Sequence, residues 1–226
     1  MGSVECLVEA KAPVNIAVIK YWGKSDEALK IPLNDSLSGT LSMDDLCTKT
    51  CVQVSDKLDK DVLILNGEEQ DLGEKSPATK MLNDIRTISP LAIGKYSNCK
   101  TRIISVNNFP TAAGLASSAA GYACLAYALG HAYGITDTTL LSKIARNGSG
   151  SACRSLFGGF VHWIRGTDHD TSVAKQVVDD CHWPEVRVII CVVNDSRKEV
   201  SSSLGMSQSV KTSPLIQFRA DTIVPQ

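Results

Sequence analysis

The sequence predicts an α+β fold, because strand patterns and helix patterns fall into different parts of its 226 residues. Short runs that alternate between apolar and polar residues, or that are apolar throughout, dominate the first third of the chain and are typical of strands. Longer runs with apolar residues three and four positions apart occupy the middle and indicate helices. Two further strand patterns come after the helices.

The expected strands of the first third are residues 12–19, 33–42, 48–54 and 62–65. The run 12–19 is apolar enough to be a buried strand, and 33–42 begins as a polar turn. The run 62–65 leads into Asn66 and Gly67, a pair that favours a tight hairpin turn. This part of the chain therefore predicts a β-rich half.

The first expected helix begins at Ser76 and Pro77, which suit an N-cap and a first helical position, and runs to residue 88. Residues 119–133 are apolar nearly all round, which indicates a helix buried on most of its faces. Thr136 or Asp137 caps a third helix, which ends at Asn147. The late strands are 160–164 and 187–193, the second buried on both faces, and Ser213 with Pro214 starts a last helix.

Composition excludes several classes of partner. The chain is 43% hydrophobic and 21% charged with a net charge of −1, which argues against nucleic acid or an anionic membrane as its main partner. Neither a membrane-length apolar run nor a signal peptide is visible, so we expect a cytoplasmic protein. The eight cysteines form no Cys-x-x-Cys pair, and we expect buried free thiols rather than a metal site. Cys47 with Cys51, or Cys181 with His182, are the weak alternatives for a metal.

The stretch 107–121 separates a strand pattern at 101–106 from the apolar helix, and it consists mostly of small residues. Small side chains let an anion approach the backbone, and the first turn of a helix offers unpaired N–H groups. Ser117 and Ser118 would add two hydroxyls for phosphate or Mg²⁺. The alternative is a well-capped turn before a core helix, and the stretch alone does not decide between them.

A second stretch of small residues, 147–155, follows the third helix and carries a single arginine, Arg154. Backbone amides in such a loop can converge on an anion, while a guanidinium gives bidentate contacts. The alternative is a plain connector with Arg154 in a surface salt bridge. Having two loops of this kind in one chain favours anion binding.

A charged and aromatic cluster at 20–24 ends the first buried strand pattern. Strand ends often present side chains to a crevice, so this cluster is a candidate site. The alternative is a strand end whose lysines extend into solvent.

Three stretches, 15–24, 107–120 and 148–159, resemble the mevalonate diphosphate decarboxylase family of the GHMP kinase superfamily. The resemblance implies a GHMP-type N-terminal lobe (ribosomal protein S5 domain 2-like, split β-α-β) at 1–185 and the beginning of a C-terminal lobe at 186–226. It implies ATP and Mg²⁺ as cofactors and mevalonate 5-diphosphate as substrate. The reaction would be ATP-dependent decarboxylation to isopentenyl diphosphate, and the whole enzyme would be a homodimer.

The resemblance also implies site residues. Lys24 and Arg154 would be catalytic, with Arg154 on the substrate carboxylate. The substrate would be bound by Asn15, Tyr21, Trp22, Gly23, Lys24, Ser149, Gly150, Ser151, Ala152, Cys153, Arg154 and one of Ser202 and Ser203. ATP would be bound by Pro110, Ala113, Gly114, Leu115, Ala116, Ser117 and Ser118, with Ser118 also on Mg²⁺.

The sequence departs from the family pattern in two places. The family has a diphosphate-binding arginine near the start of the helix at 77–88, where this chain has Pro77 and Ala78. The family's Phe-Asp-Ala-Gly-Pro-Asn motif is also missing, and its aspartate acts on the substrate hydroxyl. We therefore expect residues 1–226 to be part of a longer chain and inactive alone. The alternatives to a decarboxylase are a non-catalytic nucleotide- or partner-binding protein and a GHMP metabolite kinase.

Overall fold

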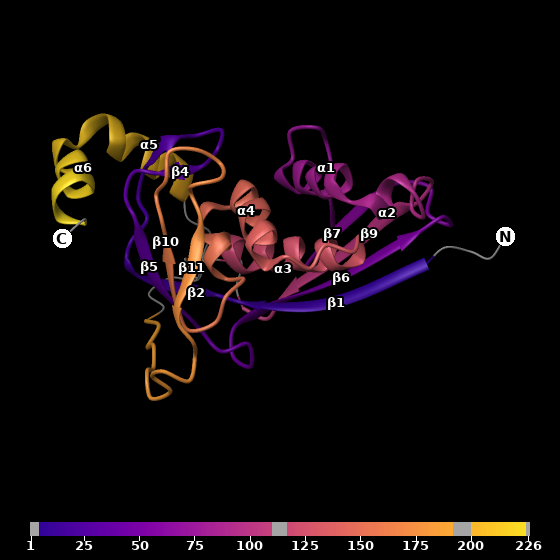
Figure 1. Ribbon diagram of the computed structural model, residues 1–226, viewed down its shortest axis with the longest axis horizontal. Helices are drawn as coiled ribbons and strands as arrows, with labels where there is room; N and C mark the ends of the chain where they lie inside the picture. The colour runs from indigo at the N-terminus through magenta and orange to yellow at the C-terminus, as the bar shows by residue number, and fades with distance from the viewer. Residues whose placement is uncertain (1–4, 110–116, 192–199, 225–226) are drawn as a thin grey trace.

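The computed structural model describes residues 5–109, 117–191 and 200–224 and has an elongated α+β architecture (Figure 1). A five-stranded sheet in the order β1-β6-β9-β7-β8 occupies one end, and a four-stranded sheet in the order β11-β10-β5-β2 occupies the other. The expected α+β class is confirmed.

The five-stranded sheet is antiparallel except where β7 and β9 pair in parallel. Its strands are β1 (Glu5–Pro13), β6 (Cys47–Ser55), β7 (Val62–Leu65), β8 (Glu68–Gln70) and β9 (Lys100–Asn107). Helix α1 lies in the connection from β7–β8 to β9, which gives the β-α-β unit its crossover. The expected hairpin is present between β7 and β8, where Asn66 (φ 51°) and Gly67 (φ 88°) form the turn.

The four-stranded sheet joins β2 (Asn15–Ile19), β5 (Ser36–Thr40), β10 (Phe160–Trp163) and β11 (Ala174–Val178). A separate small hairpin pairs β3 (Lys24–Asp26) with β4 (Ile31–Pro32). Both are antiparallel. The pairing of β5 with β10 brings segments that are far apart in the chain together at one end of the molecule.

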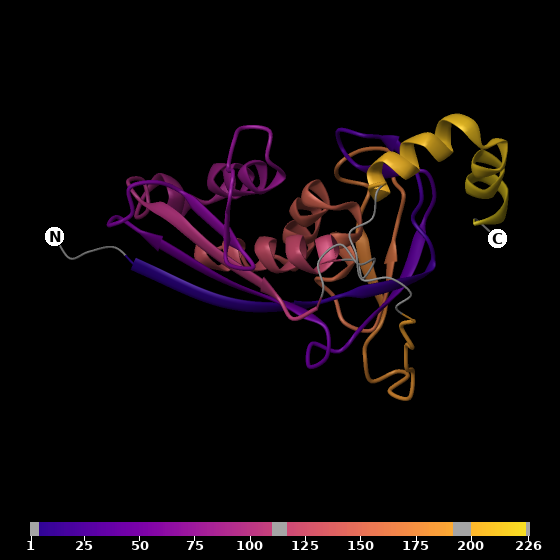
Figure 2. The same ribbon diagram turned by 180° about the vertical axis from the view of Figure 1, so that it is seen from behind.

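The helices cover one face of the five-stranded sheet (Figures 1 and 2). They are α1 (Pro77–Ile88), the short α2 (Pro90–Ile93), α3 (Ser117–Ala132) and α4 (Thr138–Gly148). Met81 and Ile85 of α1, Leu129 of α3 and Val52 of β6 are fully buried in the core between them. On the other face of the sheet, Leu7 remains exposed. The C-terminal part adds a 3₁₀ turn at Gly150–Arg154, then α5 (Ser202–Thr212), α6 (Pro214–Phe218) and a π-helical turn at Arg219–Ile223.

Two strand predictions need correction. The segment 187–191 is not a strand but exposed coil, with Ile189 90% exposed, and residues 192–193 lie outside the described residues. An apolar run forms a strand only where a neighbour pairs with it, and none of the described strands does so here. The run 12–19 is divided at Val14 between β1 and β2, and Val18 at its far end is exposed rather than buried.

The expectation of buried free thiols is right for Cys47, Cys99, Cys124 and Cys153. It is wrong for Cys181 and Cys191, which are exposed, since both lie in coil after β11 rather than in a strand. No helix in the described part of the chain is long and apolar enough to cross a membrane.

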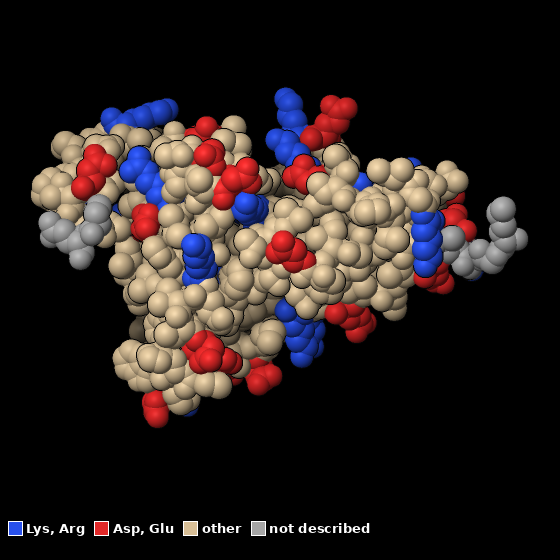
Figure 3. All heavy atoms as spheres, viewed as in Figure 1, with Lys and Arg blue, Asp and Glu red and all other residues tan. Residues whose placement is uncertain are grey.

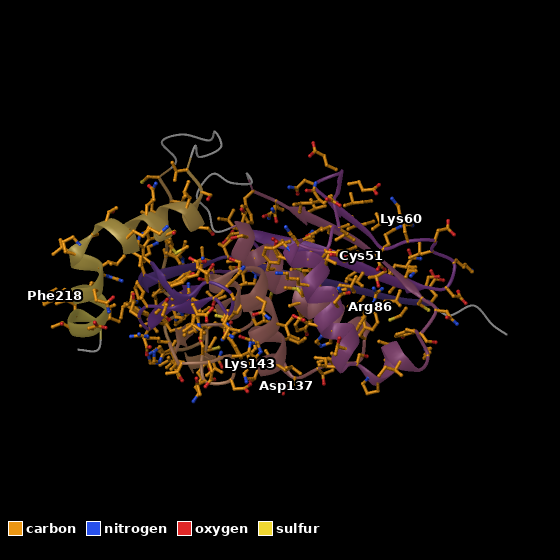
Figure 4. The ribbon with its side chains drawn as sticks, turned by 90° about the horizontal axis from the view of Figure 1, so that it is seen from above. Cys51, Lys60, Arg86, Asp137, Lys143 and Phe218 are labelled. Atoms are coloured by element: carbon orange, nitrogen blue, oxygen red, sulfur yellow. The ribbon has the colours of Figure 1, made fainter. Side chains whose placement is uncertain are left out.

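An ion pair between α1 and the residue before β7 joins the helical layer to the sheet. Arg86, labelled in Figure 4, donates to both carboxylate oxygens of Asp61 at 2.7 Å and to the Tyr133 hydroxyl at 3.0 Å. The backbone N–H of Thr101 donates to the same carboxylate at 2.8 Å. Burial acts to raise the pKa of Asp61, but these hydrogen bonds and the charge of Arg86 outweigh it and lower that pKa.

We expect Asp61→Asn to lower the free energy of unfolding at pH 7 by about 2 kcal/mol, because Arg86 loses its charged partner. A carboxylate with a lowered pKa stabilises the folded state above about pH 4, and this contribution is lost as pH falls through the folded pKa. Urea unfolding at pH 7 and pH 3 should therefore show the difference between variant and unchanged chain shrinking in acid. Glu69→Gln, in the exposed pair with Lys60, is the control and should change little. An undiminished difference at pH 3 would contradict the assignment.

Candidate functional site

The first turns of α3 are positioned by small alanine side chains on the buried face of the helix. Ala119, Ala120 and Ala123 are fully buried, which lets the helix lie close against the sheet. Ser117 and Ser118 occupy its first two positions, as predicted, and Ser118 is exposed. Their hydroxyls and the N–H groups of the first turn suit a phosphate or a hard cation such as Mg²⁺. The predicted ATP contacts Pro110, Ala113, Gly114, Leu115 and Ala116 lie outside the described residues.

The second small-residue segment, residues 149–155, is called the serine loop below. Helix α4, capped by Asp137 through bonds to the N–H groups of Thr139 and Leu140, ends at Gly148 and delivers this loop. The loop winds into the 3₁₀ turn Gly150–Arg154.

The two small-residue segments meet. The Oγ atoms of Ser118 and Ser149 are 3.2 Å apart, and those of Ser149 and Ser151 are 3.5 Å apart. Three hydroxyls, one from the first turn of α3 and two from the serine loop, thus lie next to one another. This contact joins the predicted ATP end to the predicted substrate end.

Arg154 is buried at 2% exposure, which removes the alternative of a surface salt bridge. Its Nε and Nη1 donate to the hydroxyls of Ser38 at 2.9 Å and Ser36 at 2.8 Å, and its Nη2 donates to Asn15 Oδ1 at 3.1 Å. These four residues are the arginine cluster. The guanidinium also lies 5.6 Å from the ring centre of Trp163.

Among the described residues no carboxylate pairs with Arg154, and every hydrogen-bond acceptor around it is neutral. Burial lowers the pKa of its guanidinium, while the nearby Cys153 and Tyr21 act in the opposite direction. A buried cation without an acidic partner is costly. The arrangement is therefore prepared for an anionic ligand.

Asn15 holds the arginine cluster to the serine loop. Its amide nitrogen donates to the Ser155 hydroxyl at 2.7 Å and to the Ser151 carbonyl at 3.1 Å, while its oxygen accepts from Arg154. The side-chain amide of Asn15, a predicted substrate contact, is thus hydrogen-bonded within the site and holds Arg154 in position.

Ser36, Ser38 and Ser155 belong to the site but were not predicted from sequence. A signal was available for the first two, since they alternate along β5 and are both almost completely buried. Serines at every second position of a strand place two hydroxyls on one face, and buried hydroxyls need partners. Arg154 is that partner for both.

Tyr21 brings the strand end to the same place. Its ring packs edge-on against Trp163 with ring centres 4.8 Å apart. Burial raises the pKa of its hydroxyl, which has no hydrogen-bond partner among the described residues. An unpaired buried hydroxyl is a donor available to a ligand.

The next predicted residues, Trp22 and Gly23, contact the C-terminal helices rather than the arginine cluster. Trp22 Nε1 donates to the Ser209 hydroxyl of α5 at 3.0 Å. Gly23 has φ 100°, and a Cβ there would lie 2.9 Å from Val210. Farther along, Arg219 donates to the carbonyl of Lys20 at 2.7 Å and to Asn34 Oδ1 at 2.8 Å.

Lys24 is predicted to bind substrate, and its side chain is 6% exposed with Nζ 2.6 Å from Glu27 Oε2. The predicted residues Ala152 and Cys153 are buried with their side chains in the interior. Burial raises the pKa of Cys153 to about 12, so its thiol stays protonated at neutral pH and only backbone atoms can serve a ligand. Ser202 and Ser203 begin α5 with exposed side chains, and no described hydrogen bond joins them to the arginine cluster.

On the face shown in Figure 3, acidic and basic side chains are interspersed, and neither sign forms a continuous patch. An anionic ligand on this face would therefore be held by local groups. The described site supplies these as Arg154, Lys24, the Tyr21 hydroxyl and the serine hydroxyls.

Two family models match the chain. One, described as diphosphomevalonate decarboxylase-like N-terminal domain, matches residues 12–174, and the other, described as mevalonate 5-diphosphate decarboxylase C-terminal domain, matches 188–226. The diphosphomevalonate decarboxylase of Homo sapiens is 51% identical over 230 residues, covering 96% of this chain and 56% of that protein. That of Candida albicans is 49% identical over 225 residues, covering 95% and 61%. The chain thus spans little more than half the length of these relatives.

Solved structures agree. The mevalonate diphosphate decarboxylase from Trypanosoma brucei is 48% identical with a TM-score of 0.88, over 97% of this chain and 58% of that one. A structure described as MDDEF in complex with MVAPP, AMPPCP and magnesium is 38% identical with a TM-score of 0.78, over 97% and 65%.

Proposed function

Since the chain belongs to the diphosphomevalonate decarboxylase family, we propose that its residues serve the ATP-dependent decarboxylation of mevalonate 5-diphosphate to isopentenyl diphosphate. The observation that carries the proposal is Arg154, a buried guanidinium of the serine loop that lacks an acidic partner among the described residues. A substrate with a carboxylate at one end and a diphosphate at the other would give Arg154 an acidic partner and the serine hydroxyls an anion to bind.

In this proposal the substrate carboxylate binds Arg154, which Asn15, Ser36 and Ser38 hold in place. The diphosphate lies along the serine loop and Lys24, with the Tyr21 hydroxyl as a further donor. ATP would phosphorylate the tertiary hydroxyl of the substrate. Departure of that phosphate and of CO₂ would then form the double bond.

ATP and Mg²⁺ belong to the same proposal, and the relative solved with AMPPCP and magnesium supports them. Ser117 and Ser118 at the start of α3 would hold phosphate oxygens, and Ser118 would also contact Mg²⁺. The metal would neutralise charge on the transferring phosphoryl group. The contact of Ser118 with Ser149 would keep ATP and substrate side by side, which is most of what phosphoryl transfer requires.

The proposal also covers the division of the chain into lobes and its assembly. Residues 1–185 would form the N-terminal lobe and 186–226 the beginning of the second lobe, in a cytoplasmic homodimer. The break between the two family-model matches, after residue 174 and before 188, supports this division.

The decisive test uses a chimera in which residues 1–226 replace the aligned segment of the human relative. Release of CO₂ from labelled mevalonate 5-diphosphate with ATP and Mg²⁺ is the expected result. A stable phosphorylated product would indicate a metabolite kinase instead. Binding without turnover by a folded chimera would favour a non-catalytic protein.

We expect Ser118→Ala to raise the KM for ATP in this chimera by about tenfold, because one hydrogen bond to a charged phosphate or a Mg²⁺ contact is lost. The KM for mevalonate 5-diphosphate should change much less. Steady-state kinetics with each substrate varied in turn will measure both. A defect confined to the mevalonate compound would show that the roles of the two loops are exchanged.

A further inference from the structure

The ammonium of Lys30 lies where α4 enters the serine loop, close enough to two other lysines to be affected by their charge. Lys30, in the turn between β3 and β4, donates its ammonium to the Gly148 carbonyl at 2.7 Å. Gly148 is the last residue of α4 and directly precedes Ser149. The charges of Lys24 at the start of β3 and Lys80 in α1 both act on Lys30. A positive cluster therefore borders the loop.

This cluster carries more positive than negative charge. Glu27 acts on Lys30, but its close ion pair is with Lys24 at 2.6 Å. The bonded partner of Lys30 is a neutral carbonyl, and among the described residues no carboxylate lies within ion-pair distance of it. Burial lowers the pKa of its ammonium, and the neighbouring charge of Lys24 lowers it further. A bound anion would offset the repulsion between these ammonium groups and favour their charged form.

The backbone of Lys30 supports a side-chain role. Its φ is 53°, in the left-handed region where glycine and asparagine are the usual residues. Lysine is strained in this conformation, and the turn could be formed at lower cost by glycine or asparagine. The carbonyl end of α4 also favours a cation at Gly148, which keeps the ammonium beside the loop.

We infer that Lys30 is a further anion contact of the site and binds a phosphate group of the ligand held by the serine loop. One N–H of its ammonium is used by Gly148, and the other two remain to donate to phosphate oxygens. The inference rests on the proposed function for the identity of the ligand, but the phosphate chemistry does not depend on it.

The test compares three variants of residues 1–226 by calorimetric titration with inorganic diphosphate and with mevalonate 5-diphosphate. Lys30→Gln keeps a hydrogen-bond donor for Gly148 but removes the charge, and we expect it to weaken both ligands about tenfold or more. Lys30→Arg keeps the charge and should bind nearly as the unchanged chain does. Lys60→Met is the control and should bind normally, since Lys60 lies away from α4 and its Lys143 (Figure 4).

A second measurement does not depend on variants. Diphosphate should protect Lys30, but not Lys60, from acetylation at neutral pH, as read by mass spectrometry. Undiminished binding by folded Lys30→Gln, or acetylation unaffected by diphosphate, would overturn the inference while leaving the proposed function intact. Binding of inorganic diphosphate without mevalonate 5-diphosphate would count against the proposed function alone, because the lysine comparison still applies. A folded chain that binds neither ligand would overturn both.

Discussion

Arg154→Met is expected to weaken the binding of mevalonate 5-diphosphate by about 10- to 100-fold, the effect of removing a charge-assisted, bidentate partner from a buried site. The guanidinium is aimed by Ser36, Ser38 and Asn15, so its geometry is fixed before a ligand arrives. Preorganisation of this kind makes the loss large, because little binding energy is spent on ordering the side chain.

The ligand-free protein should respond much less, by about 2 kcal/mol or less in the free energy of unfolding. Two effects oppose each other. The variant leaves buried hydroxyl and amide oxygens without their donor, which destabilises the fold. It also removes a buried charge that has no acidic partner among the described residues, which relieves an unfavourable term. Methionine keeps much of the side-chain volume, so the cavity contribution is small.

Calorimetric titration and thermal unfolding, with and without ligand, will separate these effects. Isopentenyl diphosphate lacks the carboxylate, so its affinity should not change in Arg154→Met. Arg146→Met is a matched control. Arg146 is also buried, but its guanidinium bonds the Ser172 carbonyl and the His169 ring instead. The control should keep its affinity. Equal losses for both ligands in Arg154→Met would remove Arg154 from the carboxylate.

Gly150→Ala should have the second largest effect, because the serine loop packs against two rings and one of them is held in place. A Cβ at residue 150 would lie 2.9 Å from Trp163 Cη2 and 3.1 Å from Tyr21 Cε1. Trp163 is completely buried and tied through its Nε1 to the Ser172 hydroxyl at 3.1 Å. The loop itself must therefore shift, and a displacement of only a few tenths of an ångström misaligns its hydrogen-bond donors.

We expect Gly150→Ala to lower the free energy of unfolding by about 2 kcal/mol and to weaken the binding of inorganic diphosphate at least tenfold. Gly121→Ala is the control. It lies in α3 with open space around it, and alanine there should stabilise the helix by up to about 1 kcal/mol. Urea unfolding and diphosphate titration measure both quantities. Normal affinity in Gly150→Ala would mean that the backbone of this loop does not hold the anion.

Much of the fold was predictable because local chemistry decided it. Ser76 with Pro77 marks α1, and Asp137 caps α4 as expected. The strand β11 was not predicted, because only its first residue, Ala174, is buried and its hydrophobic pattern is weak. The apolar run at 187–191 was predicted as a strand and is coil, since strand formation depends on a partner that pattern alone cannot supply.

The site divides in the same way. Ser118, Ser149 and Arg154 could be selected as candidates, because two stretches of small residues in one chain favour anion binding. The alternation of Ser36 and Ser38 along a strand marks them only as two hydroxyls on one face, because their partner Arg154 is more than a hundred residues away in the chain. Lys30 was missed for a similar reason, since the carbonyl that positions it belongs to the end of another helix.

Trp22 bonds Ser209 and Lys20 bonds Arg219, so the segment that carries Tyr21 and Lys24 is also attached to the C-terminal helices. One side of this strand end faces the serine loop, and the other carries the docked C-terminal helices. Occupancy of the site and docking of these helices therefore draw on the same segment, and any coupling between them acts equally in both directions. If a ligand that fixes Tyr21 strengthens the docking of α5, then docking of α5 raises the affinity for that ligand by the same factor.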